Sequence, residues 1–131
     1  MVLGNNDGNI IARSRAAKAL GIPMGAALHQ ARDLIRQHDV IVCSANFALY
    51  GDMSQRVMRV LEGYTPRLDV YSIDEAFLDL SPVAAWPLAQ RRAFVAAARE
   101  RVGRWTGLPV SVGVALTKTL AKAKAELATP D

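Results

Sequence analysis

The sequence lacks the features that would place a protein outside the cytosol. It contains one cysteine, Cys43, so it cannot form an internal disulfide, and this is typical of proteins kept in a reducing compartment. No apolar run approaches the roughly 18 residues of a membrane span. The first residues do not resemble a secretory signal, because Gly4 and Asn5 interrupt them. We therefore expect a cytoplasmic protein that has no membrane partner.

The sequence also lacks repeats, low-complexity segments and long linkers, and 131 residues are enough for one domain or two small lobes. A hydrophobic content of 51% with 21% charged residues is typical of a globular chain. Sixteen basic and twelve acidic side chains give a net charge of +4. This excess permits nucleic-acid binding but does not demonstrate it, because many basic proteins bind no nucleic acid.

The apolar pattern predicts an α/β fold. Helical spacing is found in residues 15–20, 25–38, 46–64, 88–105 and in a terminal helix from 118, with Ser14 and Thr117 as N-caps and Pro87 in a first turn. Strand-like patterns are found in residues 1–3, 10–12, 40–43 and 108–115, where 40–43 is expected to be buried and to contain Cys43. The turn-forming residues Gly4 to Gly8 join the first two patterns and predict an opening hairpin. The second half of the chain is therefore interpreted as a split βαβ arrangement that lacks one strand.

The stretch from Asp69 to Leu80 alternates its side chains on both sides of an acidic pair, Asp74 and Glu75. It predicts two strands that meet in a tight hairpin near this pair. Two carboxylates 4 Å apart repel by about 4 kcal/mol at an effective dielectric of about 20. A divalent cation such as Mg²⁺ would remove this repulsion. The alternative is an exposed acidic turn, in which water screens the repulsion to about 1 kcal/mol.

Two groups of basic residues are candidates for phosphate binding. Arg13 and Lys18 lie at a short predicted helix, and helix N-termini attract anions. Lys118 and Lys122 lie one turn apart on the terminal helix, which is unfavourable unless an anion lies nearby. Phosphate would suit both groups, and an ordinary solvated surface is the alternative for each.

The seven residues from Tyr71 to Phe77, Tyr-Ser-Ile-Asp-Glu-Ala-Phe, resemble the catalytic signature of Y-family translesion DNA polymerases. Four more blocks resemble the UmuC branch of that family, the catalytic subunit of the bacterial SOS mutagenesis polymerase. In order, they are Asn5–Gly8, Ala17–Gly21, Leu49–Ser54 and Thr117–Lys122. The resemblance extends over essentially the whole chain. It implies a damaged-DNA-binding, error-prone nucleotidyltransferase that acts in SOS DNA repair.

The resemblance also implies a domain layout. Residues 1–44 would form a fingers-like α/β lobe. Residues 45–131 would form a partial polymerase palm of split βαβ (ferredoxin-like) type that lacks its first strand. The thumb and little finger would be absent, so we expect the chain to be truncated at both ends.

Individual roles follow from the same resemblance. Asp74 and Glu75 would be catalytic and would bind two Mg²⁺ ions, with Asp74 shared and Glu75 on the ion nearer the primer hydroxyl. Lys18 and Arg13 would bind the nucleotide triphosphate. The residues expected to contact DNA are Ser72, Lys118 and Lys122.

Three elements of the family pattern have no match in this sequence. A third catalytic carboxylate and the aromatic residue that excludes ribonucleotides lie upstream of Val2 in the family. A lysine that touches the triphosphate aligns with Thr129. We therefore expect this fragment to be inactive, or nearly so, on its own.

The implied ligands are primer-template DNA and a deoxynucleoside triphosphate. A UmuD-like subunit, RecA and the sliding clamp are the protein partners that the family implies. One alternative is a non-catalytic polymerase homologue that acts as a scaffold in a mutasome. Another is a nucleotide cyclase of GGDEF type, which also has an acidic pair on a palm hairpin but has Gly-Gly where this chain has Ser72-Ile73.

Overall fold

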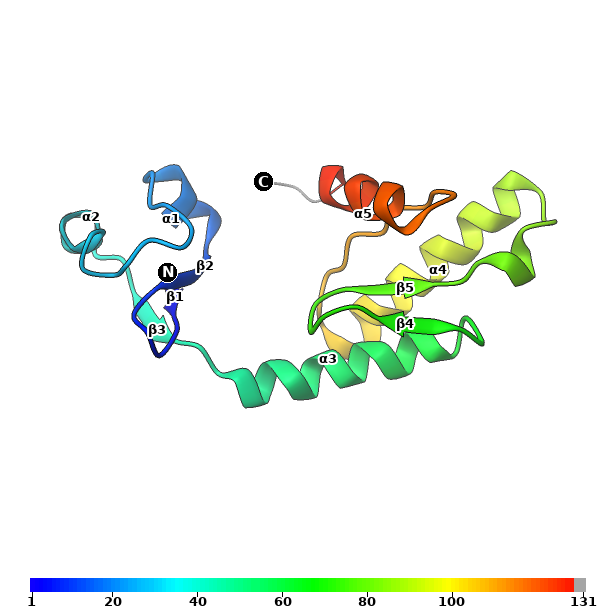
Figure 1. Cartoon of the computed structure of the whole chain (residues 1–131), viewed down its shortest axis with the longest axis horizontal. Coiled ribbons are helices and arrows are strands. Elements are labelled where there is room, and N and C mark those ends of the chain that lie inside the picture. The colour runs from blue at the N-terminus through cyan, green and yellow to red at the C-terminus, as the bar shows by residue number, and fades with distance from the viewer. Residues whose placement is uncertain (129–131) are drawn as a thin grey trace. The chain divides into compact units, whose positions relative to one another are not determined.

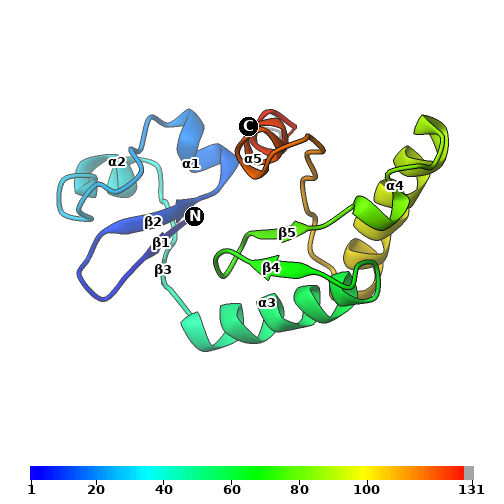
Figure 2. The same ribbon diagram turned by 45° about the vertical axis from the view of Figure 1, so that its right-hand side comes forward.

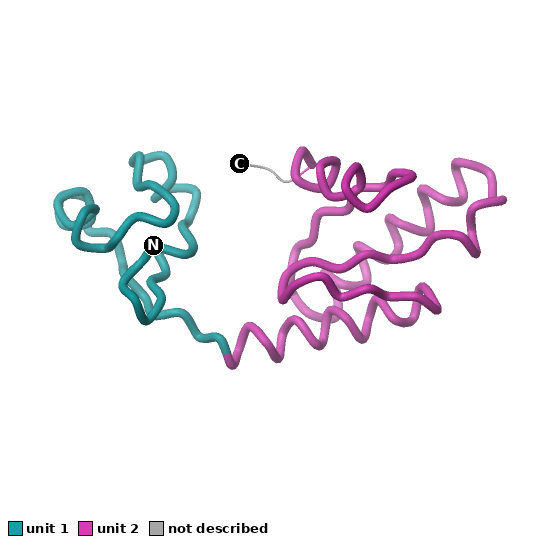
Figure 3. Tube along the Cα trace, in the orientation of Figure 1, with its two compact units in different colours: residues 1–47, 131 teal, residues 48–130 magenta. Residues whose placement is uncertain are grey.

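The computed structural model describes residues 1–128. The chain divides into two compact units, one of residues 1–47 and a second that begins at Ala48 (Figure 3). The assignment of residues 1–44 to a fingers-like lobe and of 45–131 to a partial palm stays a prediction. Thr129 lies outside the described residues.

The first unit is built on a three-stranded sheet with the order β2-β1-β3 (Figure 1). Strand β1 (Val2–Gly4) pairs antiparallel with β2 (Ile10–Arg13), which confirms the predicted opening hairpin, and parallel with β3 (Val42–Ser44). Helix α1 (Arg15–Ala19) begins after Ser14, whose Oγ accepts a hydrogen bond from the Ala17 amide at 3.3 Å, as the N-cap prediction requires. The buried core of this unit is formed by Val2, Ile10, Ala17, Ile22 and Ala31.

The predicted helix over residues 25–38 is wrong in its first half. Helix α2 spans only Arg32–Gln37. The residues before it run alongside β2, because the Gly25 amide donates to the Ile10 carbonyl and the Ile10 amide donates to the Ala26 carbonyl, both at 2.9 Å. Leu28 and Leu34 nevertheless pack against the buried core. A segment of turns followed by a short helix therefore satisfies the same apolar spacing as one longer helix.

The predicted buried strand over residues 40–43 is shifted and is not buried. Strand β3 begins at Val42, and the residues around its start are exposed, by 66% for Ile41 and 44% for Val42. Cys43 is a half-buried free thiol within the strand. Because β3 is an edge strand, only one of its sides is covered by a neighbouring strand.

The second unit contains a β-hairpin and three helices. It consists of α3 (Phe47–Glu62), β4 (Leu68–Val70), β5 (Ala76–Leu78), a 3₁₀ turn (Ser81–Val83), α4 (Leu88–Thr106) and α5 (Lys118–Leu127). In two views the hairpin runs between α3 on one side and α5 on the other (Figures 1 and 2). Buried residues of α3 (Met58 and Val60) and of α4 (Ala98 and Val102) form its core, so the predicted long helix is confirmed.

Within residues 1–128, no helix combines the length and the apolar character needed to cross a bilayer.

The predicted strand over residues 108–115 is wrong, because none of these residues is in a strand. The segment is tied to helices instead: Arg99 Nε donates to the Val110 carbonyl and Lys124 Nζ donates to the Val114 carbonyl, each at 3.1 Å. A strand exists only as part of a ladder with a neighbour. The predicted split βαβ arrangement lacks one strand, and this segment has no strand beside it within the described part of the second unit.

Asp79 is hydrogen-bonded to the first residue of the turn that follows the hairpin. Its Oδ1 accepts hydrogen bonds from the Ser81 hydroxyl at 2.5 Å and from the Ser81 amide at 2.9 Å. These bonds, with a smaller contribution from Arg67, lower the pKa of Asp79 below its usual value. The pKa of Asp79 is lower in the folded chain than in the unfolded chain, so these bonds stabilise the fold fully above the unfolded carboxyl pKa of about 4. The stabilisation is lost as the pH falls through the lower, folded-state pKa.

Asp79→Asn is therefore expected to be less stable than the parent chain at pH 7, and the difference should shrink as the pH falls below about 4. Urea unfolding followed by circular dichroism between pH 7 and pH 3 measures this. A difference that stays constant over this range would show that the carboxylate charge contributes nothing.

Candidate functional site

The acidic pair lies at the end of a longer hairpin loop than the sequence predicts. Asp69 pairs with Phe77 and Val70 with Ala76, so residues 71–75 form the connection in place of a two-residue turn. The loop is closed by the Tyr71 and Ser72 amides, which donate to the Glu75 carbonyl at 3.0 and 3.1 Å. A five-residue loop avoids the positive φ angles of tight hairpins, and none of residues 71–75 has a positive φ. This explains why Asp-Glu is tolerated here.

The two carboxylates are on the same side of the loop. The Ser72 hydroxyl lies 2.7 Å from Asp74 Oδ1 and 3.5 Å from Glu75 Oε2. Asp74 is exposed, and the side chain of Glu75 is 34% exposed. The Ser72 hydroxyl thus lies near both carboxylates, and the two carboxylates lie on the same side of the loop. A cation shared by the two carboxylates would require this arrangement.

Lys122 of α5 is paired with Glu75. Its Nζ lies 2.9 Å from Oε1 and 3.1 Å from Oε2 of the carboxylate. The same ammonium group lies 5.2 Å from the centre of the Tyr71 ring. The hydrogen bond with Glu75 is the main reason why the pKa of Lys122 is raised, so this lysine is protonated at neutral pH.

Lys118 repeats this arrangement one turn earlier on α5. It pairs with Asp69 of β4, and its Nζ lies 5.4 Å from the centre of the Phe77 ring. Asp69 and Phe77 are directly opposed in the hairpin, so they present a carboxylate and a ring on one face of the ribbon. Each lysine therefore contacts one carboxylate and one aromatic ring of the hairpin.

The sequence predicts an anion near Lys118 and Lys122, and the structure supplies two from the chain itself. The hairpin carboxylates neutralise the like charges that lie one turn apart on α5. All four side chains are partly exposed, with between 34% and 62% of each in contact with solvent. Such pairs contribute about 0 to 1 kcal/mol each, so a competing ion or phosphate can displace them. Their predicted contact with DNA stays a prediction.

The donor atoms at the hairpin end fit Mg²⁺ in kind but not in number. Carboxylate and hydroxyl oxygens are the hard donors that Mg²⁺ prefers. Among residues 1–128, however, no three acidic, histidine or cysteine side chains are grouped closely enough to hold a metal ion. Asp74 and Glu75 are thus two candidate ligands, and their role in metal binding and catalysis stays a prediction.

The two residues predicted to bind a triphosphate belong to the first unit. Arg13 Nη1 donates to the Ile22 carbonyl at 2.5 Å, while its buried Nε has no hydrogen-bond partner among the described residues. Arg13 therefore holds the loop after α1 in place. Lys18 is exposed on α1, so its ammonium is accessible to a ligand. Their role in triphosphate binding stays a prediction.

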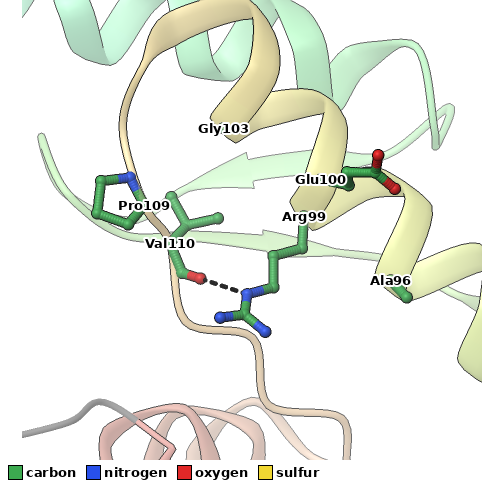
Figure 4. Close-up of a pocket in the computed structure, with 6 residues that line it drawn as sticks. All are labelled: Ala96, Arg99, Glu100, Gly103, Pro109 and Val110. Atoms are coloured by element: carbon green, nitrogen blue, oxygen red, sulfur yellow. Dashed lines mark hydrogen bonds between the residues drawn. The ribbon is translucent and has the colours of Figure 1, made fainter.

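A hollow of about 370 Å³ lies elsewhere in the second unit, where the chain after α4 passes back along that helix (Figure 4). It is lined by Ala96, Arg99, Glu100, Gly103, Pro109 and Val110. The Arg99 side chain crosses it to reach the Val110 carbonyl, whereas the Glu100 carboxylate points away from that bond (Figure 4). This hollow contains none of the predicted site residues, and its arginine has a structural role.

The sequence interpretation missed the partners of the two lysines. Asp69, Tyr71 and Phe77 contact them across 41 to 51 residues of chain. A signal was available, because strand alternation places Asp69 and Tyr71 on one face and the lysines share one face of a helix. Nothing in the sequence, however, indicates that these two faces meet.

Comparison with known proteins identifies the lineage. The model of the impB/mucB/samB family matches residues 1–126. The chain belongs to this family. The family's curated members include Protein ImpB of Salmonella typhimurium, which is 50% identical over 122 residues covering 93% of this chain. Protein UmuC of the same species is 46% identical over 122 residues, again 93% of the chain. The predicted recognition of a UmuC-type Y-family sequence is thus confirmed.

DNA polymerase IV 2 of Mesorhizobium japonicum is also similar, with 38% identity over 124 residues, or 95% of this chain. The chain spans 28% of the length of ImpB and UmuC and 29% of that of this polymerase. It therefore corresponds to less than a third of each of these relatives.

Solved structures agree with the family assignment. A ternary complex of Dbh has a TM-score of 0.88 and 25% sequence identity, and it covers 98% of this chain and 38% of the Dbh chain. DinB from Sulfolobus solfataricus has a TM-score of 0.87 and 25% identity over 98% of this chain and 38% of its own. The predicted α/β fold of Y-family type is thereby confirmed.

Proposed function

We propose that this chain carries the fingers and part of the palm of an error-prone, UmuC-type translesion DNA polymerase of SOS DNA repair. The reaction is template-directed transfer of a deoxynucleotide to a primer, performed by the full-length protein in the cytoplasm. The observation that carries the proposal is the pair Asp74 and Glu75, which share the Ser72 hydroxyl at the end of a palm-like hairpin. Membership of the impB/mucB/samB family supports it.

Two Mg²⁺ ions, when bound, would activate the primer hydroxyl and stabilise the triphosphate and its leaving group. Asp74 and Glu75 are the residues that would hold them. The Ser72 hydroxyl keeps the two carboxylates on one side of the loop. Lys122 neutralises Glu75 in the absence of a metal. Since the described residues supply no third carboxylate, this chain by itself is expected to be inactive.

The basic residues are proposed to bind phosphates. Lys18 is accessible on α1 and would contact the triphosphate, with Arg13 as a second contact. Lys118 and Lys122 would contact the DNA backbone after exchanging their carboxylate partners for phosphate, as the solvent exposure of both pairs permits. A UmuD-like subunit, RecA and the sliding clamp are proposed as partners from the family resemblance alone.

Two alternative functions predict different results in the assay described below. A scaffold without catalysis is consistent with an acidic pair that no third acidic side chain joins among residues 1–128. A GGDEF-type cyclase is disfavoured, because Ser72 and Ile73 stand where a cyclase has two glycines and Ser72 contacts both acids.

The proposal is tested by primer extension with the longest form of the gene product, on a template with an abasic site. Incorporation is expected, and Asp74→Asn should reduce it by about 100-fold or more, because a metal ligand contributes several kcal/mol to the transition state. Asp52→Asn, at an exposed carboxylate of α3, is the matched control and should retain activity. Absence of incorporation in the parent protein would favour the scaffold. Formation of a cyclic dinucleotide from GTP would overturn the polymerase assignment.

A further inference from the structure

A second hollow in the second unit lies between α3 and the end of α4. It has a volume of about 230 Å³ and is lined by Arg56, Arg59, Val60, Trp105 and Thr106. We call it the Trp105 hollow. None of its lining residues belongs to the hairpin or to α5, so it is separate from the acidic pair.

Trp105 forms an exposed aromatic wall of this hollow. It is 67% exposed, although it is one of the largest apolar side chains of the protein. The Arg101 guanidinium lies 5.4 Å from the centre of the Trp105 ring and 5.1 Å from that of Tyr64, so this arginine is held between two rings. Surface tryptophan and arginine are the residues most enriched at the centres of protein interfaces.

Of the two arginines that line the hollow, Arg59 is the one without an ion pair among residues 1–128. Arg56 pairs with Asp52 at 2.9 Å, and Arg104 pairs with Glu100 one turn away. Arg59 makes no ion pair with any carboxylate in residues 1–128. Val60 and Trp105 thus lie beside the Arg59 guanidinium, which is exposed and makes no ion pair within residues 1–128. This combination suits a side chain with a carboxylate close to an aliphatic group.

We propose that the Trp105 hollow binds an acidic peptide segment of a partner protein, through one carboxylate on Arg59 and one aliphatic side chain against Trp105. A guanidinium binds a carboxylate through paired hydrogen bonds, and the volume accommodates one or two side chains. Single-stranded DNA fits less well, because such sites are basic grooves that follow several phosphates. Here one of the two arginines that line the hollow, Arg56, is already paired with Asp52.

The binding is measured with the whole 131-residue chain and a capped octapeptide of alternating glutamate and leucine. The indole N–H signal of Trp105 is followed by NMR, with that of Trp86, which packs edge-on against Phe94, as the internal reference. The peptide should shift the Trp105 signal and leave that of Trp86 in place. Arg59→Gln should raise the Kd about tenfold, since it removes a charge-assisted hydrogen bond. Arg92→Gln, at an exposed arginine of α4 outside the hollow, should change the Kd by less than about twofold.

Three results would overturn the proposal. The first is that the peptide does not shift the Trp105 signal. The second is that Arg59→Gln and Arg92→Gln lose affinity for the peptide equally. The third is that oligothymidylate shifts the Trp105 signal more than the peptide does. The acidic pair has no part in this site, so the combined variant Asp74→Asn and Glu75→Gln should bind the peptide as the parent chain does. If the peptide does not bind, the polymerase proposal is unaffected. If the polymerase proposal is wrong, peptide binding at the Trp105 hollow is unaffected.

Discussion

Gly113→Ala is expected to destabilise the second unit by about 1 to 3 kcal/mol, the usual cost of overpacking. A Cβ at this position would lie closer than 3.0 Å to the Ala121 carbonyl oxygen, the Ala125 amide nitrogen and the Lys124 Cβ, all on α5. Two of these neighbours are backbone atoms that cannot rotate away, so α5 itself must move. That movement would separate its lysines from the hairpin carboxylates.

Urea unfolding followed by tryptophan fluorescence measures this effect, because Trp86 and Trp105 both belong to the second unit. Gly51→Ala is the matched control. Gly51 lies within α3 with no atom within 4 Å of the added Cβ, so alanine should stabilise the helix by up to about 1 kcal/mol. If both variants were stabilised equally, α5 would not lie against residue 113 as the structure places it.

Ile10→Ala is expected to unfold the first unit. Ile10 is completely buried between β1, α1 and the loop after α1, and removing a buried isoleucine side chain costs about 2 to 5 kcal/mol. A unit of 47 residues buries a small core and has little stability in reserve. Amide hydrogen exchange of residues in β1 and β2 should lose its protection in this variant.

Ile41→Ala provides the comparison for this prediction. Ile41 is 66% exposed, so its truncation should change stability by no more than about 0.5 kcal/mol and leave exchange in β1 and β2 unaltered. Unchanged protection in Ile10→Ala would mean that the first unit does not depend on the core described for it.

Periodicity predicts the elements whose two sides differ in polarity. The α3 helix was predicted over 46–64 and spans Phe47–Glu62, because its apolar residues recur at helical spacing and two of them, Met58 and Val60, are buried. The opening hairpin and the caps Ser14 and Thr117 were predicted for the same kind of local reason. Each of these signals is contained within a few residues of the element that it specifies.

The errors arise where the structure depends on a distant neighbour. Residues 108–115 have strand-forming residues at alternate positions, but no strand lies beside them to form a ladder in residues 48–128. Leu28 and Leu34 reach the core from a turn and a helix respectively, a difference that spacing alone does not reveal.

The candidate site likewise has a part that local sequence predicts and a part that depends on distant residues. The position of Asp74 and Glu75 at the end of a hairpin follows from local alternation. The pairing of Lys118 with Asp69 and of Lys122 with Glu75 joins residues 49 and 47 positions apart. No local pattern predicts that α5 lies against this face of the hairpin. The anion expected near Lys118 and Lys122 was therefore assigned to a ligand and not to carboxylates of the chain.

The central claim is that Asp74 and Glu75 together bind a divalent cation, and isothermal titration of the 131-residue chain with Mn²⁺ tests it most directly. Mn²⁺ prefers the same oxygen donors as Mg²⁺. We predict a weak single site that is lost in the combined variant Asp74→Asn and Glu75→Gln. It should persist in Asp69→Asn, which removes a carboxylate of the same hairpin that is paired with Lys118. Mn²⁺ binding that is unchanged in the combined variant would contradict the account.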